Sequence, residues 1–170
     1  MPICVAGMHR SGTSLVARLL AASGVYGGSP AELVAPAPDN PEGFGESLPF
    51  LRLNDAVLAR LGGFWDSPPA MPPGWAVSPR LSNLRRDAAT LVGRFRGQEP
   101  WFWKDPRNRS PWRSGGEVIP DLWVVVCVRS PQEVVASLNV GVGLMPPRAG
   151  RSGSPTTAGC WRRCRRSASW

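Results

Sequence analysis

The chain has 170 residues, 42% of them hydrophobic and 19% charged, which is ordinary for a globular protein and allows one domain with a real core, although the length is short for a complete nucleotide-dependent transferase. Its net charge of +8 suggests a nucleic-acid partner until the charge is located. Residues 140–170 hold six arginines and no acid, which leaves fourteen basic against twelve acidic residues, or +2, for the rest. A general polyanion-binding face is therefore not supported, and no nucleic-acid partner is expected.

The sequence gives no support for a membrane protein or for a zinc-binding protein. There is no basic-then-apolar leader and no apolar run of about 18 residues, so we expect a soluble, cytoplasmic protein without a membrane anchor. Cys160 and Cys164 lack the additional cysteines or histidines that would complete a zinc site, so no metal is expected.

The first informative stretch predicts a strand, a phosphate-binding loop and a helix. The apolar run 2–6 leads into Gly7-Met8-His9-Arg10-Ser11-Gly12-Thr13-Ser14, and an apolar helical pattern follows. Gly7 and Gly12 permit a turn that directs successive N–H groups inward, and the helix beginning at Thr13 has partial positive charge at its N-terminus. The pattern therefore predicts an anion site.

The loop differs from that of nucleotide triphosphatases, because Thr13 stands where they carry lysine and Arg10 is the substitute cation. With its cation before the second glycine and two hydroxyls after it, the loop resembles the 5′-phosphosulfate loop of sulfotransferases that use 3′-phosphoadenosine 5′-phosphosulfate (PAPS). A β-turn-helix that merely contains glycine and serine is the alternative. The resemblance implies that PAPS is bound by Gly7, His9, Arg10, Ser11, Gly12, Thr13 and Ser14.

Four elements are expected after the loop. The first helix should pack on the sheet and end at Ser23-Gly24, and the proline-rich stretch 29–45 should be a surface excursion near the mouth of the site. A helix should follow and end at Gly62-Gly63. Another should run from an N-cap at Ser78 to Gly97, with Arg85, Arg86 and Arg94 on its solvated face.

The segment 40–46, Asn-Pro-Glu-Gly-Phe-Gly-Glu, followed by Leu53-Asn54-Asp55, resembles the region after the loop in bacterial sulfotransferase-like proteins. A glutamate downstream of the loop is the base in related carbohydrate and tyrosylprotein sulfotransferases, so the resemblance makes Glu46 the candidate base. Gly45 departs from the tryptophan expected there. As an alternative, Glu46 is an acid that stabilises the following helix.

Residues 101–107, Trp-Phe-Trp-Lys-Asp-Pro-Arg, predict a short aromatic strand that ends in a charged turn. Lys104 is the only lysine beside nineteen arginines, and the sequence again resembles the bacterial sulfotransferase-like group. At the carboxyl end of a strand beside the loop, Lys104 and Arg107 could face the sulfuryl group or the acceptor, with Asp105 orienting them. A structural salt-bridge turn is the alternative.

Residues 121–129 contain a continuous apolar run, 122–128, which predicts a parallel strand that is buried on both faces, and Arg129 ends it. A helix begins after Ser130, with Pro131 at its first position. Arg129 and Ser137 match the spacing with which sulfotransferases hold the 3′-phosphate of PAPS, and arginine and serine supply suitable donors.

Beyond Asn139 the chain becomes rich in Gly, Pro, Ser, Arg and Trp and loses amphipathic periodicity. One interpretation is a disordered basic tail. A shifted reading frame would instead permit an apolar, Trp-Tyr-Tyr-Leu-Leu-type helix that resembles the one following this position in bacterial sulfotransferase-like proteins. We hypothesise that residues 140–170 are out of frame, and that residues 1–139 are the N-terminal portion of the family's domain.

Taken together, the sequence predicts a three-layer α/β fold, a P-loop-type parallel sheet with helices on both faces, incomplete at the C-terminus. The resemblance implies transfer of a sulfuryl group from PAPS to an acceptor hydroxyl or amine, without metal, with Glu46, Arg10 and Lys104 as catalytic residues. A kinase using ATP and magnesium and a non-catalytic, truncated nucleotide-binding remnant are the alternatives. No recognisable pattern in the sequence indicates whether the acceptor is a small molecule, carbohydrate, lipid or peptide. None indicates the oligomeric state either.

Overall fold

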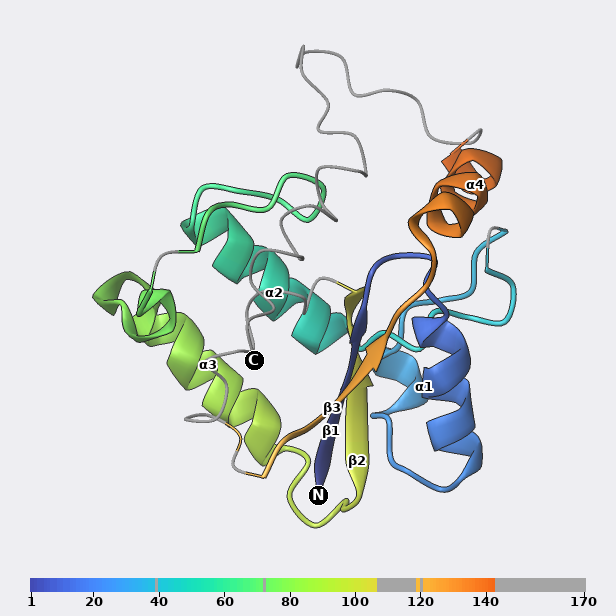
Figure 1. The fold of residues 1–170 in the computed structure, drawn as a ribbon. Helices are drawn as coiled ribbons and strands as arrows, with labels where there is room; N and C mark the ends of the chain where they lie inside the picture. Colours follow the sequence, from blue (N-terminus) through green and yellow to red (C-terminus); the bar gives the residue numbers. More distant parts are fainter. Residues whose placement is uncertain (39, 72, 107–118, 120, 143–170) are drawn as a thin grey trace. The chain divides into compact units, whose positions relative to one another are not determined.

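The computed structural model describes residues 1–38, 40–71, 73–106, 119 and 121–142 (Figure 1). The chain divides into two compact units, Met1–Val128 and Arg129–Trp170. The predicted boundary near Asn139 therefore differs from the structural division, which falls at the end of a strand. Arg107 and residues 143–170, which are most of the segment 140–170 hypothesised to be out of frame, lie outside the described residues.

The first unit is built on a three-stranded parallel sheet in the order β2-β1-β3. β1 (Pro2–Gly7) is the central strand, and β2 (Trp101–Lys104) and β3 (Trp123–Cys127) pair with it on either side. Val5 lies opposite Lys104 on one side, and Gly7 lies opposite Cys127 on the other. Because the strands are parallel, their carboxyl ends meet at one edge of the sheet, and the predicted phosphate loop, residues 7–14, begins there.

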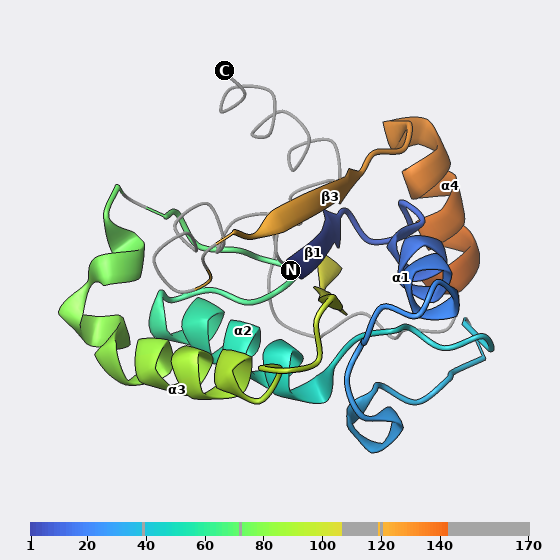
Figure 2. The same cartoon turned by 90° about the horizontal axis from the view of Figure 1, so that it is seen from below.

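Helices cover both faces of this sheet (Figures 1 and 2). α1 (Thr13–Ala22) packs on one face, and α2 (Leu48–Arg60) and α3 (Ser82–Gly93) pack on the other. The alternation of side chains along a strand produces this division. The α1 face contains Ile3, Val5, Ala17 and Phe102, and the other face contains Cys4, Ala6, Phe50, Leu53, Ala88, Leu91, Trp101 and Trp103.

Short 3₁₀ turns connect the main elements at Pro30–Glu32, Trp75–Val77 and Pro79–Leu81. The expected N-cap at Ser78 is confirmed, since its hydroxyl accepts from the Arg80 amide at 3.4 Å. It caps the last of these 3₁₀ turns, and the α-helix proper begins only at Ser82.

α1 packs on the sheet, as predicted, through Ala17 with Val16 and Leu20 beside it, whereas Leu15 and Leu19 on the same helix are exposed. The prediction that Arg85 lies on the solvated face of α3 was wrong. Arg85 does not extend into solvent, because its guanidinium donates to the carbonyl oxygens of Ala76 and Ser78, both at 2.8 Å, and so ties the preceding turn to α3.

The prediction that β3 is buried on both faces was also wrong. Trp123 is 64% exposed, Val126 63% and Val128 75%. β3 is an edge strand among the described residues, since only β1 pairs with it. An apolar run predicts a strand whose side chains favour burial, but it does not specify which segment packs against them.

In the second unit, the described residues form one helix after a short turn. α4 (Pro131–Val142) begins with proline at its first position, as predicted, and the Val134 amide donates to the Ser130 carbonyl at 3.0 Å. The helix extends three residues past the predicted end of regular structure at Asn139.

Candidate functional site

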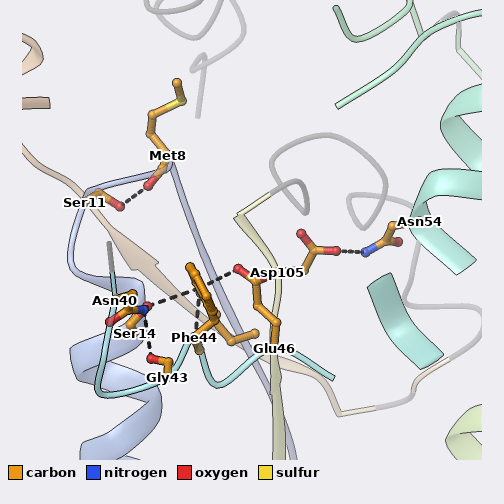
Figure 3. Close-up of polar contacts among 10 residues, drawn as sticks. Met8, Ser11, Ser14, Asn40, Gly43, Phe44, Glu46, Asn54 and Asp105 are labelled. Carbon is orange, nitrogen blue, oxygen red and sulfur yellow. Dashed lines mark hydrogen bonds and ion pairs between the residues drawn. The ribbon is translucent and has the colours of Figure 1, made fainter. Parts of the chain in front are cut away.

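The predicted phosphate loop connects β1 to α1, and its geometry depends on positive backbone φ angles. Arg10 has φ 65° and Gly12 has φ 92°. Ser11 closes a turn on Met8, since its amide and its hydroxyl both donate to the Met8 carbonyl, at 3.1 and 2.6 Å (Figure 3). Arginine in a left-handed conformation is uncommon, and such residues concentrate at ligand-binding loops.

Gly7 is required at the start of the loop because of close packing. A Cβ added there would lie 2.7 Å from the Cys127 carbonyl oxygen and 2.7 Å from the Ser11 hydroxyl. At Gly12, by contrast, an added Cβ would meet nothing within 4 Å. The loop is therefore tightly packed against the sheet at its first glycine and open at its second.

The N-terminus of α1 has the properties of an anion site. Gly12 is its N-cap and supplies no side-chain hydrogen bond to the first turn, which contains no acidic residue. The first amide groups of a helix have no intrahelical acceptors, and the helix dipole adds partial positive charge at the same end. These donors fit phosphate or sulfate oxygens.

A buried ion pair lies beside this helix terminus. Lys104 Nζ is 2.7 Å from Glu46 Oε1, and the two side chains are only 2% and 11% exposed. The same ammonium donates to Ser14 Oγ at 3.3 Å and to the Phe44 carbonyl at 3.2 Å. Lys104 thus joins the end of β2, the first turn of α1 and the segment before α2.

The segment that carries Glu46 is attached to α1 by further polar contacts. Asn40 Nδ2 donates to the Gly43 carbonyl at 2.8 Å and reaches Ser14 Oγ at 3.5 Å (Figure 3). Arg18 pairs with Glu42 at 2.8 Å on the surface. Ser14 Oγ accepts from both Lys104 and Asn40, so its hydroxyl proton can be donated to a ligand oxygen.

The neighbouring Asp105 is held by a second polar pair. Its Oδ2 accepts from Asn54 Nδ2 at 2.7 Å, and Asp105 and Asn54 are 0% and 1% exposed. Asn54 comes from α2, so this contact joins the middle of that helix to the end of β2. The carboxylate of Asp105 therefore supports the backbone that positions Lys104.

An aromatic side chain lies against the phosphate loop. The rings of Trp65 and His9 have centroids 5.2 Å apart, and Trp65 is 45% exposed. The loop that carries Trp65 is closed tightly, since a Cβ added at Gly63 would overlap the Pro69 ring. The Trp65–His9 contact thus places a large apolar side chain beside the candidate anion site.

The thiol of Cys127 lies at the same edge of the sheet, opposite Gly7. Burial raises its pKa above the ordinary value, and the positive charge of Lys104 opposes the shift. Because the rise from burial is the larger effect, Cys127 remains a protonated thiol at neutral pH and is a poor nucleophile.

The structure brings most of the predicted site residues together at the carboxyl edge of the sheet. These are the loop residues Gly7, His9, Arg10, Ser11, Gly12, Thr13 and Ser14, together with Glu46 and Lys104. Glu46 does not lie in the first turn of α2, which contains no acid, and its carboxylate pairs with Lys104.

Arg129 and Ser137 lie in the second unit, where Arg129 Nε is 3.3 Å from Glu133 Oε2, one turn along α4. Their assignment to the 3′-phosphate stays a prediction.

Sequence reasoning missed three contributors to the site. The Phe44 carbonyl was not predictable, because a backbone acceptor has no sequence signal. The Asn54–Asp105 contact joins positions 51 residues apart. Asn40 and Asn54 both lie in segments that carry the family resemblance. That resemblance is the one sequence signal that could have pointed to them.

Within the described residues, no group of three or more His, Cys, Asp or Glu side chains could hold a metal ion. Among the helices of the described ranges, none combines the length and the apolar character that crossing a membrane requires.

Comparison of the chain with known proteins gave no match to a protein-family model, to a curated protein or to a solved structure.

Proposed function

We propose that this chain is a P-loop-type sulfotransferase domain that binds PAPS and transfers its sulfuryl group to an acceptor hydroxyl or amine. The observation that carries the proposal is the convergence of the phosphate loop with the buried Glu46–Lys104 pair through Ser14. The candidate anion site and the Glu46 carboxylate then lie at one edge of the sheet. The sequence resemblance supplies the identity of the anion.

The donor set fits a phosphosulfate group. The open side of Gly12, the uncapped first turn of α1 and the Ser14 hydroxyl offer neutral donors, and Arg10 adds a positive charge. In the reaction, an acceptor oxygen or nitrogen forms a bond to sulfur while the bond from sulfur to the 5′-phosphate oxygen breaks. Donors directed at the leaving phosphate stabilise the charge that develops there.

Glu46 would take the proton that the acceptor loses, which is a contribution of roughly 10²–10⁴ in rate for a positioned base. The Lys104 ammonium keeps this carboxylate in place, and its other contacts, to Ser14 and the Phe44 carbonyl, also lie within the protein. We therefore assign Lys104 to positioning Glu46 relative to the loop. A direct contact with the sulfuryl oxygens would require it to exchange one of these acceptors.

The roles of the two arginines can be separated by calorimetric titration with adenosine 3′,5′-bisphosphate and with adenosine 5′-phosphosulfate. Arg10→Ala should weaken both ligands, because both place an anion in the loop. Arg129→Ala should weaken only the bisphosphate, which alone carries a 3′-phosphate. Equal losses for both ligands in Arg129→Ala would refute its predicted role, and Arg86→Ala, which changes an arginine on α3, is the matched control.

A further inference from the structure

The segment 40–46, which carries the candidate base, is attached to one face of α1. Residues 14, 17 and 18 share this face, because residues three and four apart on a helix are neighbours. The contacts are those of Ser14 with Asn40 at 3.5 Å, of Arg18 with Glu42 at 2.8 Å, and of Ala17 with Gly45, where an added Cβ would lie 3.0 Å from the Ala17 Cβ. The Asn40 contact differs from the other two because it reaches a residue of the phosphate loop.

We propose that Asn40 is a positioning residue, which orients the Ser14 hydroxyl so that its proton points at the anion bound in the phosphate loop. The inference rests on the proposed function, because the anion site is the one assigned there to the phosphosulfate group. It adds a residue that acts on this site through Ser14.

The orientation of the Asn40 amide follows from its contact with the Gly43 carbonyl, to which Nδ2 donates at 2.8 Å. A carbonyl oxygen only accepts, so the nitrogen and not Oδ1 faces it. The second N–H of the same nitrogen is then available to Ser14 Oγ (Figure 3). The backbone of Asn40 is also fixed, since its amide donates to the Ala37 carbonyl at 2.8 Å and its carbonyl accepts from the Gly43 amide at 3.0 Å.

The Ser14 hydroxyl is approached by two donors. A serine hydroxyl has two acceptor positions and one proton. Lys104 Nζ lies 3.3 Å from Ser14 Oγ, and Asn40 Nδ2 lies 3.5 Å from the same oxygen. When both acceptor positions are used, the proton takes the remaining direction. With Lys104 alone, the hydroxyl could rotate and turn its proton toward the segment 40–46, so Asn40 removes one of two orientations.

The position of Ser14 on α1 makes this direction matter for a ligand. Ser14 is the second residue of the helix, at the end where the first amides have no intrahelical acceptors. The Cα–Cβ bonds of a helix tilt toward its N-terminus, which places the hydroxyl beside the candidate anion site. A hydrogen bond from a hydroxyl to an anion is stronger than one between neutral groups. A long contact from Asn40 can therefore influence anion affinity by selecting the direction of that bond.

Inorganic sulfate tests this role, because it can occupy the loop without the rest of a nucleotide. Titration of the intact chain at constant ionic strength, followed by the backbone amide signals of the loop in NMR spectra, measures its dissociation constant. Asn40→Ala should weaken sulfate about three- to tenfold, and Ser14→Ala should weaken it about tenfold or more. In the Ser14→Ala background, Asn40→Ala should cause no further loss, because the hydroxyl through which it acts is gone. Equal losses in the two backgrounds would overturn the proposal.

Glu42→Gln is the matched control, since it breaks the other polar contact between the segment and α1. It also removes an acid, so it should not weaken sulfate. If it weakened sulfate as much as Asn40→Ala does, attachment of the segment and not the orientation of Ser14 would be the cause, and the proposal would fail.

Asn40→Asp repeats the cycle with a side chain of the same shape that also favours turns, so the test does not depend on whether Asn40→Ala folds. It lacks the N–H donors, and its negative charge acts on sulfate in both backgrounds. Its effect should therefore be larger with Ser14 present than in Ser14→Ala, and equal effects would count against the proposal.

The proposed function can fail separately. Binding of sulfate without binding of adenosine 5′-phosphosulfate, with the Asn40 cycle as expected, would contradict the assignment to PAPS and support the role of Asn40. A loop whose amide signals do not respond to sulfate would overturn the role of Asn40.

Discussion

Lys104 is the residue on which the site depends most. It is 2% exposed and donates to Glu46, Ser14 and the Phe44 carbonyl. An ammonium has three N–H donors, so these contacts match its capacity. An apolar pair of similar volume can be as stable as a buried ion pair, so stability alone does not account for this one. The fixed geometry of the contacts is what an apolar pair could not supply. We therefore interpret Lys104 as the residue that sets the position of Glu46.

Removal of Lys104 should destabilise the fold strongly. Lys104→Met leaves the carboxylate of Glu46 buried without its cation, which typically costs about 3–5 kcal/mol in the free energy of unfolding. Urea denaturation measures this cost. The combined change Lys104→Met with Glu46→Leu should recover most of the loss, because no buried charge then remains.

Arg18→Ala is the matched control, since Arg18 forms an ion pair with Glu42 at 2.8 Å, close to the 2.7 Å of the Lys104–Glu46 pair, but on the surface. Exposed pairs contribute about 0–1 kcal/mol. If Lys104→Met cost no more than Arg18→Ala, Lys104 would not be a buried, charge-compensating residue.

Cys127 should make stability fall at alkaline pH. Burial raises the pKa of its thiol above the unfolded value, so between the two pKa values the folded state holds more protons than the unfolded state. Its contribution is present below the unfolded pKa and is lost as pH rises through the folded pKa. Cys127→Ala should therefore reduce the decline of unfolding free energy above about pH 8. Parallel pH profiles for the two proteins would contradict the assignment.

At the scale of the elements, the two glycines of the phosphate loop should respond differently to substitution. Gly7→Ala places a Cβ 2.7 Å from a backbone oxygen of β3, so the strand pair must shift, and overpacking of this kind costs about 1–3 kcal/mol or more. Gly12→Ala meets open space and costs only the strain of φ 92°, about 1–2 kcal/mol. Thermal unfolding of both variants measures the difference, and a larger loss for Gly12→Ala would contradict the described packing.

The strand-loop-helix unit at the N-terminus was predictable because its signals are local. Glycine spacing, an apolar run and a helical pattern each act within a few residues, and β1 and α1 have the expected bounds. The cap at Ser78 and the proline at the start of α4 were predictable for the same reason. The partners of Arg85 were not, because a helical pattern cannot distinguish a solvated arginine from one that folds back onto a turn.

At the scale of the whole molecule, the prediction was limited by contacts between distant residues. Glu46 and Lys104 were each singled out, but nothing local indicates that residues 58 positions apart form a pair. The apolar run of β3 predicted a strand correctly and its burial wrongly, since burial depends on which other segments pack against the strand. Residue-level patterns thus singled out candidate side chains, whereas the tertiary structure determined which of them meet.

The most direct test of the proposed function is calorimetric titration of the intact chain with adenosine 3′,5′-bisphosphate and, separately, with ATP and magnesium. Thr13 at the position of the nucleotide triphosphatase lysine and the predicted 3′-phosphate pair Arg129 and Ser137 favour the bisphosphate. We predict that the bisphosphate binds more tightly, and that Arg10→Ala weakens it. Tighter binding of ATP with magnesium, or no binding of either nucleotide, would contradict the assignment of this site to PAPS.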